Sequence, residues 1–219
     1  MFQRTIGLIM AAVMTLACTA CGQTSTQEEN GSSGLPESQS SRSETLSSTA
    51  GEQAPSVGGK TLVVYFTWSG NTEEMAAYIA DQVGGDLLEI EPREAYPSDY
   101  NETGEVAKVE RDENTRPEIA NLPASIDEYD TILIGYPIWW HTAPMIIGTF
   151  LESYDLTGVQ VYPFTQSASM DTEQFDNSVE FVRESAAGAT VHDGLFARPS
   201  DTAAIDAYLT EHGLTVDGE

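Results

Sequence analysis

The stretch TWSGNT, residues 67–72, places neutral polar side chains and one glycine between an apolar run and an amphipathic segment. Gly70 lets the backbone approach a ligand closely. If a helix begins here, its first N–H groups are unpaired and lie at the positive end of the helix dipole. These features predict an anion site, such as a phosphate site, without a cation. Its hydroxyl and amide groups come from Thr67, Ser69, Asn71 and Thr72.

The same stretch also fits a helix start that is already capped. Asn71 and Glu74 have the spacing of a capping box, and Glu73 and Glu74 would satisfy the helix dipole. The stretch lacks the GK[ST] ending of a nucleotide-triphosphate loop and the G-x-G-x-x-G fingerprint of a dinucleotide site. An anion site and a capped helix therefore both remain open here.

A second loop after an apolar run, YPIWWHTAP at residues 136–144, carries two adjacent tryptophans between two prolines. Indoles in a loop either plug the core or present a flat face to a flat ligand. Trp68 adds a third ring, so all three tryptophans of the chain follow expected strand ends. A phosphate site beside flat aromatic faces indicates a planar ligand that bears a phosphate.

Other catalytic chemistry is sparse in the sequence. The three histidines, His141, His192 and His212, are scattered and form no pair at metal-ligand spacing. His212 is expected to complement the end of a helix, and His141 lies in the tryptophan loop. Residues 60–219 contain no cysteine nucleophile and no G-x-S-x-G motif. A bound cofactor would therefore have to supply any chemistry.

Strands and helices are expected to alternate along the part of the chain that carries these residues. Unbroken apolar, β-branched runs indicate strands buried on both faces. Such an alternation predicts a parallel sheet with helices on both faces and right-handed crossovers. The expected strands are 60–66, 86–92, 130–137, 159–165 and 189–197, and the expected helices are 71–85, 143–154, 171–186 and 201–213.

Ligands of such sheets bind beyond the carboxyl ends of the strands, where the winding direction reverses. Three loops follow strand ends in the middle of the expected sheet, at 67–72, 136–144 and 165–171. The long polar stretch 93–129 departs from the alternation, with a short helix expected near 105–112. We expect this stretch to lie on the surface, next to whatever the sheet binds.

The first 21 residues have the pattern of an export signal of the lipoprotein type. Arg4 is followed by an apolar run too short for a bilayer, which needs about 20 apolar residues. Small residues precede both cysteines of the chain, so Cys18 and Cys21 are alternative lipidation sites, and Cys18 is preferred because it directly follows the apolar run. An ordinary cleaved secretory signal is the alternative.

Residues 22–59 are rich in Ser, Gly, Thr, Gln and Glu and lack aromatic residues. Such a segment cannot bury enough apolar surface to offset its ordering entropy, which predicts a flexible tether. Residues 60–219 have the usual length of one domain. The chain carries 35 acidic and 9 basic residues, for a net charge of −26, so we expect no nucleic-acid partner.

The segments VVYFTWSGNT and IGYPIWWHTAPMIIGTFLESYDLTG, with their spacing, resemble the flavodoxin-like family, in particular its exported or lipid-anchored bacterial branch. The resemblance extends from residue 60 to the C-terminus. It implies a three-layer α/β/α sandwich with a five-stranded parallel sheet in the order 2-1-3-4-5. It also implies an FMN cofactor.

The resemblance assigns roles to residues of the three loops. The phosphate of FMN would lie on the first loop, at Thr67, Ser69, Gly70, Asn71 and Thr72, with Trp68 beside it. The isoalloxazine ring would lie against Pro137, Ile138, Trp139, Trp140 and His141. The third loop would close the other side of the ring with Thr165, Gln166, Ser167 and Ser169, and it has fewer glycines than is usual in the family.

The resulting hypothesis is FMN-dependent electron transfer by a domain anchored at the outer face of a bacterial membrane. Its partner would be a redox protein or a small electron acceptor. Acidic surroundings without a nearby cation oppose the anionic reduced flavin and predict a low potential. Each ~1.4 kcal/mol of such opposition lowers a one-electron potential by about 60 mV. Two alternatives are an NAD(P)H-dependent reductase of quinones or other small acceptors, and a flavin-free binding module with the same fold.

Overall fold

A computed structural model describes residues 59–216 of the chain. The expected signal at 1–21, with Cys18 and Cys21, and all of the expected tether except Gly59 lie outside the described residues. Within residues 59–216, no helix is both long enough and apolar enough to cross a membrane.

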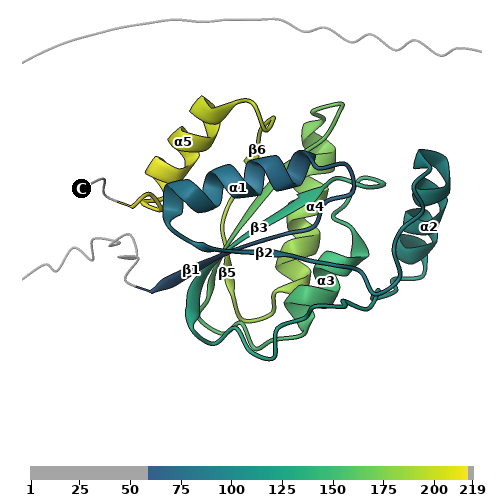
Figure 1. The fold of residues 1–219 in the computed structure, drawn as a ribbon, viewed down its shortest axis with the longest axis horizontal. Helices are drawn as coiled ribbons and strands as arrows, with labels where there is room; N and C mark the ends of the chain where they lie inside the picture. Colours follow the sequence, from purple (N-terminus) through teal and green to yellow (C-terminus); the bar gives the residue numbers. More distant parts are fainter. Residues whose placement is uncertain (1–58, 217–219) are drawn as a thin grey trace, which may run out of the picture. The chain divides into compact units, whose positions relative to one another are not determined.

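The described residues form one parallel sheet with helices on both faces, as predicted (Figure 1). The strand order is β2-β1-β3-β4-β5, and β6 pairs with β4 beyond the end of β5. The strands are β1 (Lys60–Tyr65), β2 (Asp86–Glu89), β3 (Tyr129–Pro137), β4 (Gln160–Gln166), β5 (Thr190–Val191) and β6 (Leu195–Phe196). The helices are α1 (Asn71–Val83), α2 (Tyr100–Asp112), α3 (Met145–Glu152), α4 (Thr172–Ser185) and α5 (Thr202–Glu211).

The central strands are apolar on both faces because each face is covered by helices. Val63 of β1 pairs with Leu133 of β3, which pairs with Tyr162 of β4, and this row packs in one apolar cluster with residues of α1 and α5. The neighbouring row, which includes Val64 and Ile134, packs with residues of α3 and α4 on the opposite face. Burial on both faces explains why these strands lack polar alternation.

The last strand is interrupted, whereas the sequence predicted one strand over 189–197. The backbone N–H of His192 donates to Val161 O and that of Ala197 donates to Thr165 O. Alternate residues of β4 therefore form the hydrogen bonds to β5 and β6. Pro163 lies between these two acceptors and has no N–H to donate to the neighbouring strand. The ladder is therefore broken opposite Pro163, and the edge divides into β5 and β6.

Helix α2 stands at the end of the domain rather than on the sheet (Figure 1). It begins earlier than the predicted helix near 105–112, because the carboxylate of Asp99 accepts hydrogen bonds from the N–H groups of Asn101 and Glu102. Only Thr103 and Ala107 of this helix are buried. Its position therefore depends on contacts with the loops at the carboxyl edge of the sheet.

Candidate functional site

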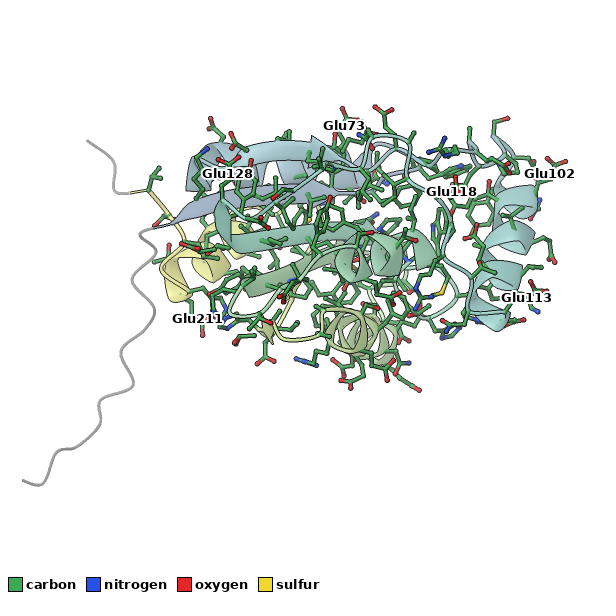
Figure 2. The ribbon with its side chains drawn as sticks, turned by 90° about the horizontal axis from the view of Figure 1, so that it is seen from below. Glu73, Glu102, Glu113, Glu118, Glu128 and Glu211 are labelled. Atoms are coloured by element: carbon green, nitrogen blue, oxygen red, sulfur yellow. The ribbon has the colours of Figure 1, made fainter. Side chains whose placement is uncertain are left out.

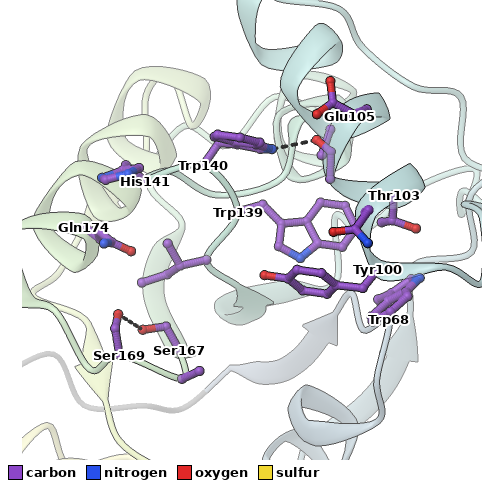
Figure 3. A pocket seen from close by; sticks show the side chains of 15 residues that line it. Trp68, Tyr100, Thr103, Glu105, Trp139, Trp140, His141, Ser167, Ser169 and Gln174 are labelled. Carbon is purple, nitrogen blue, oxygen red and sulfur yellow. Dashed lines mark hydrogen bonds between the residues drawn. The ribbon is translucent and has the colours of Figure 1, made fainter.

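A cavity of about 520 Å³ opens at the carboxyl ends of β3 and β4, beside α2 (Figure 3). All three tryptophans of the chain line it, as the sequence predicted for one end of the sheet. The predicted site residues in its wall are Trp68, Ile138, Trp139, Trp140, His141, Ser167 and Ser169. The other predicted residues, Thr67, Gly70, Asn71, Thr72 and Pro137 among them, do not line the cavity.

The first loop presents an uncapped helix start. Gly70 precedes α1 with a left-handed φ of 86°, and no side chain caps this helix end. Asn71 instead donates from Nδ2 to Ser69 Oγ over 3.2 Å, so the capping-box interpretation of Asn71 and Glu74 is wrong. The N–H of Gly70 donates to Thr67 Oγ1 over 3.0 Å and shapes the turn. The first N–H groups of α1 therefore stay available to an anion.

Trp139 serves both of the roles that the sequence left open. Its half-buried ring packs edge-on against Phe66, with ring centroids 5.4 Å apart, and against Tyr96 at 5.1 Å. The ring also lines the cavity. It therefore extends the apolar core into the cavity wall, and its orientation is set by core residues.

Trp140 and His141 form the tip of a tight turn with unusual backbone geometry. Trp139 and Thr142 exchange backbone hydrogen bonds of 2.9 and 3.1 Å across this turn. The φ angles of Trp140 and His141 are 48° and 67°, in the left-handed region that costs a non-glycine residue roughly 1–2 kcal/mol. Such strain persists only where surrounding contacts enforce it.

Those contacts come from α2. The indole Nε1–H of Trp140 donates to the carbonyl of Gly104 over 2.6 Å. The guanidinium of Arg111 donates to the carbonyl of Trp140 over 3.0 Å and lies 5.5 Å from the centre of its ring. Trp68 makes a similar link from the first loop, since its Nε1–H donates to Pro97 O over 3.0 Å.

The third loop divides into a buried part and an exposed part. Thr165 is fully buried within β4, where its hydroxyl donates to the carbonyl of Tyr136, and Gln166 ends the strand. Neither residue lines the cavity. Ser167 and Ser169 do, with their hydroxyls 3.2 Å apart. Only the part of this loop beyond the strand therefore faces the candidate site.

Helix α2 contributes to the cavity wall, which was not predicted from the sequence. The stretch 93–129 was expected to lie beside the ligand, but its residues were not assigned to the site. The capping signal at Asp99 could have located the helix start. The helix supplies Tyr100, Asn101, Thr103, Gly104, Glu105 and Ala107 to the wall, and α4 supplies Gln174.

The cavity wall is aromatic and neutral apart from one carboxylate and one imidazole. None of its lining residues is Lys or Arg, and its carboxylate belongs to Glu105. Acidic side chains also project from several sides of the described domain, as Glu73, Glu102 and Glu113 illustrate in Figure 2. An electron-rich ligand here would meet no compensating cation in the wall.

A partly buried carboxyl lies behind this wall. Tyr96 donates from its hydroxyl to Glu110 Oε2 over 2.9 Å, beneath Trp139. Burial raises the pKa of Glu110, although the hydrogen bond from Tyr96 opposes this, and burial also raises the pKa of Tyr96. Among residues 59–216, no cluster of three acidic, histidine or cysteine side chains could hold a metal ion.

Two of the three histidines, His192 and His212, lie close together although the sequence suggested that all three are scattered. His192 stacks on Tyr162 with ring centroids 4.1 Å apart, and His212 lies 5.8 Å from His192. Neither residue lines the cavity. His141 alone remains at the candidate site.

Comparison with protein families identifies the family to which this chain belongs. A family model described as flavodoxin matches residues 60–209. This chain belongs to the flavodoxin family. Flavodoxin membership agrees with the observed strand order and with the position of the cavity beyond the strand ends. A comparison with curated proteins gave no match.

The match between this flavodoxin and similar solved structures covers nearly the whole length of those structures. A protein of Bacteroides eggerthii, provisionally described as a flavoprotein, is 34% identical, with 71% of this chain and 98% of that chain covered and a TM-score of 0.63. A flavoprotein of Lactobacillus acidophilus, solved in complex with FMN, is 30% identical, with 66% and 97% covered and a TM-score of 0.57.

Proposed function

We propose that this flavodoxin binds FMN and transfers single electrons. The observation that carries the proposal is the pairing of an uncapped helix start at Gly70 with an aromatic cavity at the same edge of the sheet. The first can hold a phosphate through backbone N–H groups and neutral hydroxyls. The second can hold a flat ring system. The residues present therefore fit FMN, which would supply the redox chemistry when bound.

The similarity to known proteins supports this proposal. The Lactobacillus acidophilus flavoprotein that was solved with FMN shares 30% of its aligned residues with this chain. The family model spans all three loops that the proposal assigns to FMN, at 67–72, 136–144 and 165–171. In this chain Thr67, Ser69, Gly70, Asn71 and Thr72 would hold the phosphate, and the residues of the cavity wall would hold the ring.

The composition of the wall favours a carrier over a reductase that uses pyridine nucleotides. A nicotinamide dinucleotide brings phosphate groups of its own. With the start of α1 taken by the FMN phosphate, the wall offers them no Lys or Arg and one carboxylate, Glu105. The same lack of cations opposes the anionic reduced flavin and supports a low potential. The partner would be a redox protein or a small electron acceptor.

The absorption spectrum of the purified protein, followed by titration with FMN, tests the proposal. We expect a yellow protein, or a colourless one whose thermal unfolding temperature rises when FMN is added. Replacing Trp140 by alanine should weaken FMN binding by about 1–3 kcal/mol, because a ring of the wall is lost. A colourless protein that FMN does not stabilise would leave the flavin-free binding module as the remaining candidate.

Anaerobic mixing of the flavin-loaded protein with NADH and NADPH separates a carrier from a reductase. We expect the flavin absorbance to persist, because the wall gives no cationic site for the dinucleotide phosphates. Rapid bleaching would instead support an oxidoreductase that reduces quinones or other small acceptors. Free FMN mixed with the same nucleotides gives the background rate.

We further propose that the protein is anchored by lipid at the outer face of a bacterial membrane. The proposal rests on the apolar run and the small residues before Cys18 and Cys21. Mass spectrometry of the N-terminal peptide from a membrane fraction would identify the modified cysteine. Serine at Cys18 should release the protein from that fraction, whereas release only by serine at Cys21 would assign the anchor there, and release by neither would contradict the proposal.

A further inference from the structure

Gly104 occupies a position in α2 that the chain's own structure does not explain. It lies inside the helix Tyr100–Asp112 and does not have the left-handed φ that favours glycine elsewhere in the chain. Glycine inside a helix is less favourable than alanine, because its backbone loses more conformational freedom on folding. A Cβ built on Gly104 would meet no heavy atom within 4 Å, so no neighbour among the described residues requires its absence.

Gly104 borders the cavity as well as this open space. Gly104 is part of the cavity wall, between Tyr100 and Ala107 on the same helix. Its carbonyl accepts the indole N–H of Trp140, so the backbone at this point is held against the second loop. The missing side chain therefore leaves a bare stretch of helix backbone facing a space large enough for a ligand.

The surroundings indicate what could occupy that space. Trp68, Trp139, Trp140 and Tyr100 provide flat aromatic surfaces in the same wall, which contains one acidic side chain, Glu105, and no Lys or Arg (Figure 3). A planar, uncharged ring system fits such a wall, whereas a phosphate does not. The candidate anion site is separate from this wall, on the first turn of α1.

We infer that α2 forms a third wall of the flavin-ring site and that the ring passes over the bare backbone at Gly104. The inference rests on the proposed binding of FMN. It adds a wall that the loops after β3 and β4 do not supply, and it makes Gly104 a residue that determines which rings fit. Any side chain at this position would occupy space that the ring needs.

Two variants and two ligands test the inference in the full-length protein. Gly104→Ala adds one methyl group, and Gly104→Leu fills more of the space. Val109→Leu is the matched control, because Val109 is on the same helix, is 51% exposed and does not line the cavity. Binding of FMN and of riboflavin, which has the ring without the phosphate, is measured by quenching of flavin fluorescence.

We expect Gly104→Leu to weaken the binding of FMN and of riboflavin by the same factor, about tenfold or more. Gly104→Ala should weaken both by a smaller factor. The thermal unfolding temperature of the ligand-free protein should not fall in Gly104→Ala, because alanine favours the helix more than glycine does. Val109→Leu should bind both ligands as the wild type does. This pattern would support a ring contact at Gly104.

Other outcomes would overturn the inference. If Gly104→Leu and Gly104→Ala bind both flavins like the wild type, the ring does not pass over α2. If the binding of FMN weakens and that of riboflavin does not, the substitution acts on the phosphate site and the inference is wrong. If the wild type binds neither flavin, the proposed function itself fails, and this result is distinct because no variant is needed to see it.

Discussion

At the scale of single residues, Trp140 connects the second loop to α2. Its left-handed backbone costs free energy, and its side chain returns a hydrogen bond to Gly104 while Arg111 holds its carbonyl. The cost of the left-handed backbone and the gain from each hydrogen bond are of similar size, about 1 kcal/mol. The orientation of this ring is therefore determined jointly by the turn and by α2.

Glu110 is the residue behind the wall whose charge state should affect stability. Burial raises its pKa in the folded protein, so the folded state favours the protonated carboxyl and loses stability as the pH rises through that pKa. Glu110→Gln keeps an acceptor for the Tyr96 hydroxyl and removes the charge. We expect this variant to be more stable than the wild type at pH 7, by urea unfolding, and the advantage to disappear near pH 4.

The control for that experiment is Glu113→Gln, on the exposed C-terminal side of the same helix. It removes an equal charge without releasing a partly buried carboxyl. An equal gain in both variants at pH 7 would mean that net charge, and not burial of Glu110, is responsible.

The stacked histidine predicts a second pH dependence, of opposite sign. Burial, followed by the nearby His212, lowers the pKa of His192, whereas Asp193 opposes the shift. The unfolded chain therefore binds a proton more readily, and stability falls as the pH drops below the ordinary histidine value of about 6.5. Replacing His192 by glutamine should remove this part of the acid sensitivity in urea unfolding at pH 8 and pH 5.

The surroundings of His192 make it the responsible group. Its Nε2 lies 2.7 Å from Gln160 Oε1 and its ring stacks on Tyr162, while Arg183 lies 3.2 Å from the neighbouring Asp193. His141→Gln is the comparison, because that histidine is exposed in the loop after β3. If His141→Gln and His192→Gln reduce the acid sensitivity equally, the stacked position has no special role.

At the scale of elements, α2 differs from the other helices in what holds it. Helices α1 and α5 share one apolar cluster with the sheet, and α3 and α4 contribute to the other. Helix α2 buries two residues and is held by hydrogen bonds that Trp140 and Tyr96 donate to it and that Arg111 donates to Trp140. Trp68 bonds to Pro97, in the segment just before the helix. The local stability of α2 should therefore be lower than that of the helices on the sheet.

Hydrogen exchange followed by mass spectrometry can test this difference. We expect amides of residues 100–112 to exchange faster than those of α1, and Trp140→Phe to accelerate them further, because the ring remains and its N–H donor is lost. Exchange in α1 should not change in this variant. Equal exchange of α2 and α1 in the wild type would contradict the prediction.

At the scale of the whole molecule, the excess of acidic residues dominates. A net charge of −26 disfavours the addition of an electron to any bound group, and the cavity wall supplies no Lys or Arg to offset it. Salt screens these charges over about 8–10 Å at moderate ionic strength. The potential of a bound flavin should therefore depend on salt.

We expect the potential of the FMN-loaded protein for full reduction to rise when salt is increased from about 10 mM to about 1 M. Screening of roughly 1 kcal/mol would raise this two-electron potential by about 20 mV. Anaerobic spectroelectrochemistry measures the shift, with free FMN under the same salt conditions as the reference. A potential that follows free FMN at every salt concentration would show that the acidic surroundings have no effect.

Periodicity in the sequence was sufficient for the sheet. Apolar runs such as 130–137 and helical patterns such as 71–85 depend on local composition, and burial on both faces leaves no other consistent arrangement. The positions of the three tryptophans at one edge followed directly, because parallel strands end at the same side. The break at Pro163 depended on which neighbour its missing N–H faces, which local sequence does not specify.

The candidate site was predictable where it follows strand ends and unpredictable where distant segments meet. The three tryptophans could be placed at this edge from the sequence, because each follows the end of a strand, whereas Thr67, Gly70, Asn71 and Thr72 do not line the cavity. The wall formed by α2, the choice between a capped and an open helix start at Gly70, and the meeting of His192 with His212 required the folded chain. Each depends on contacts between residues far apart in sequence, or on a backbone angle that several local sequences allow.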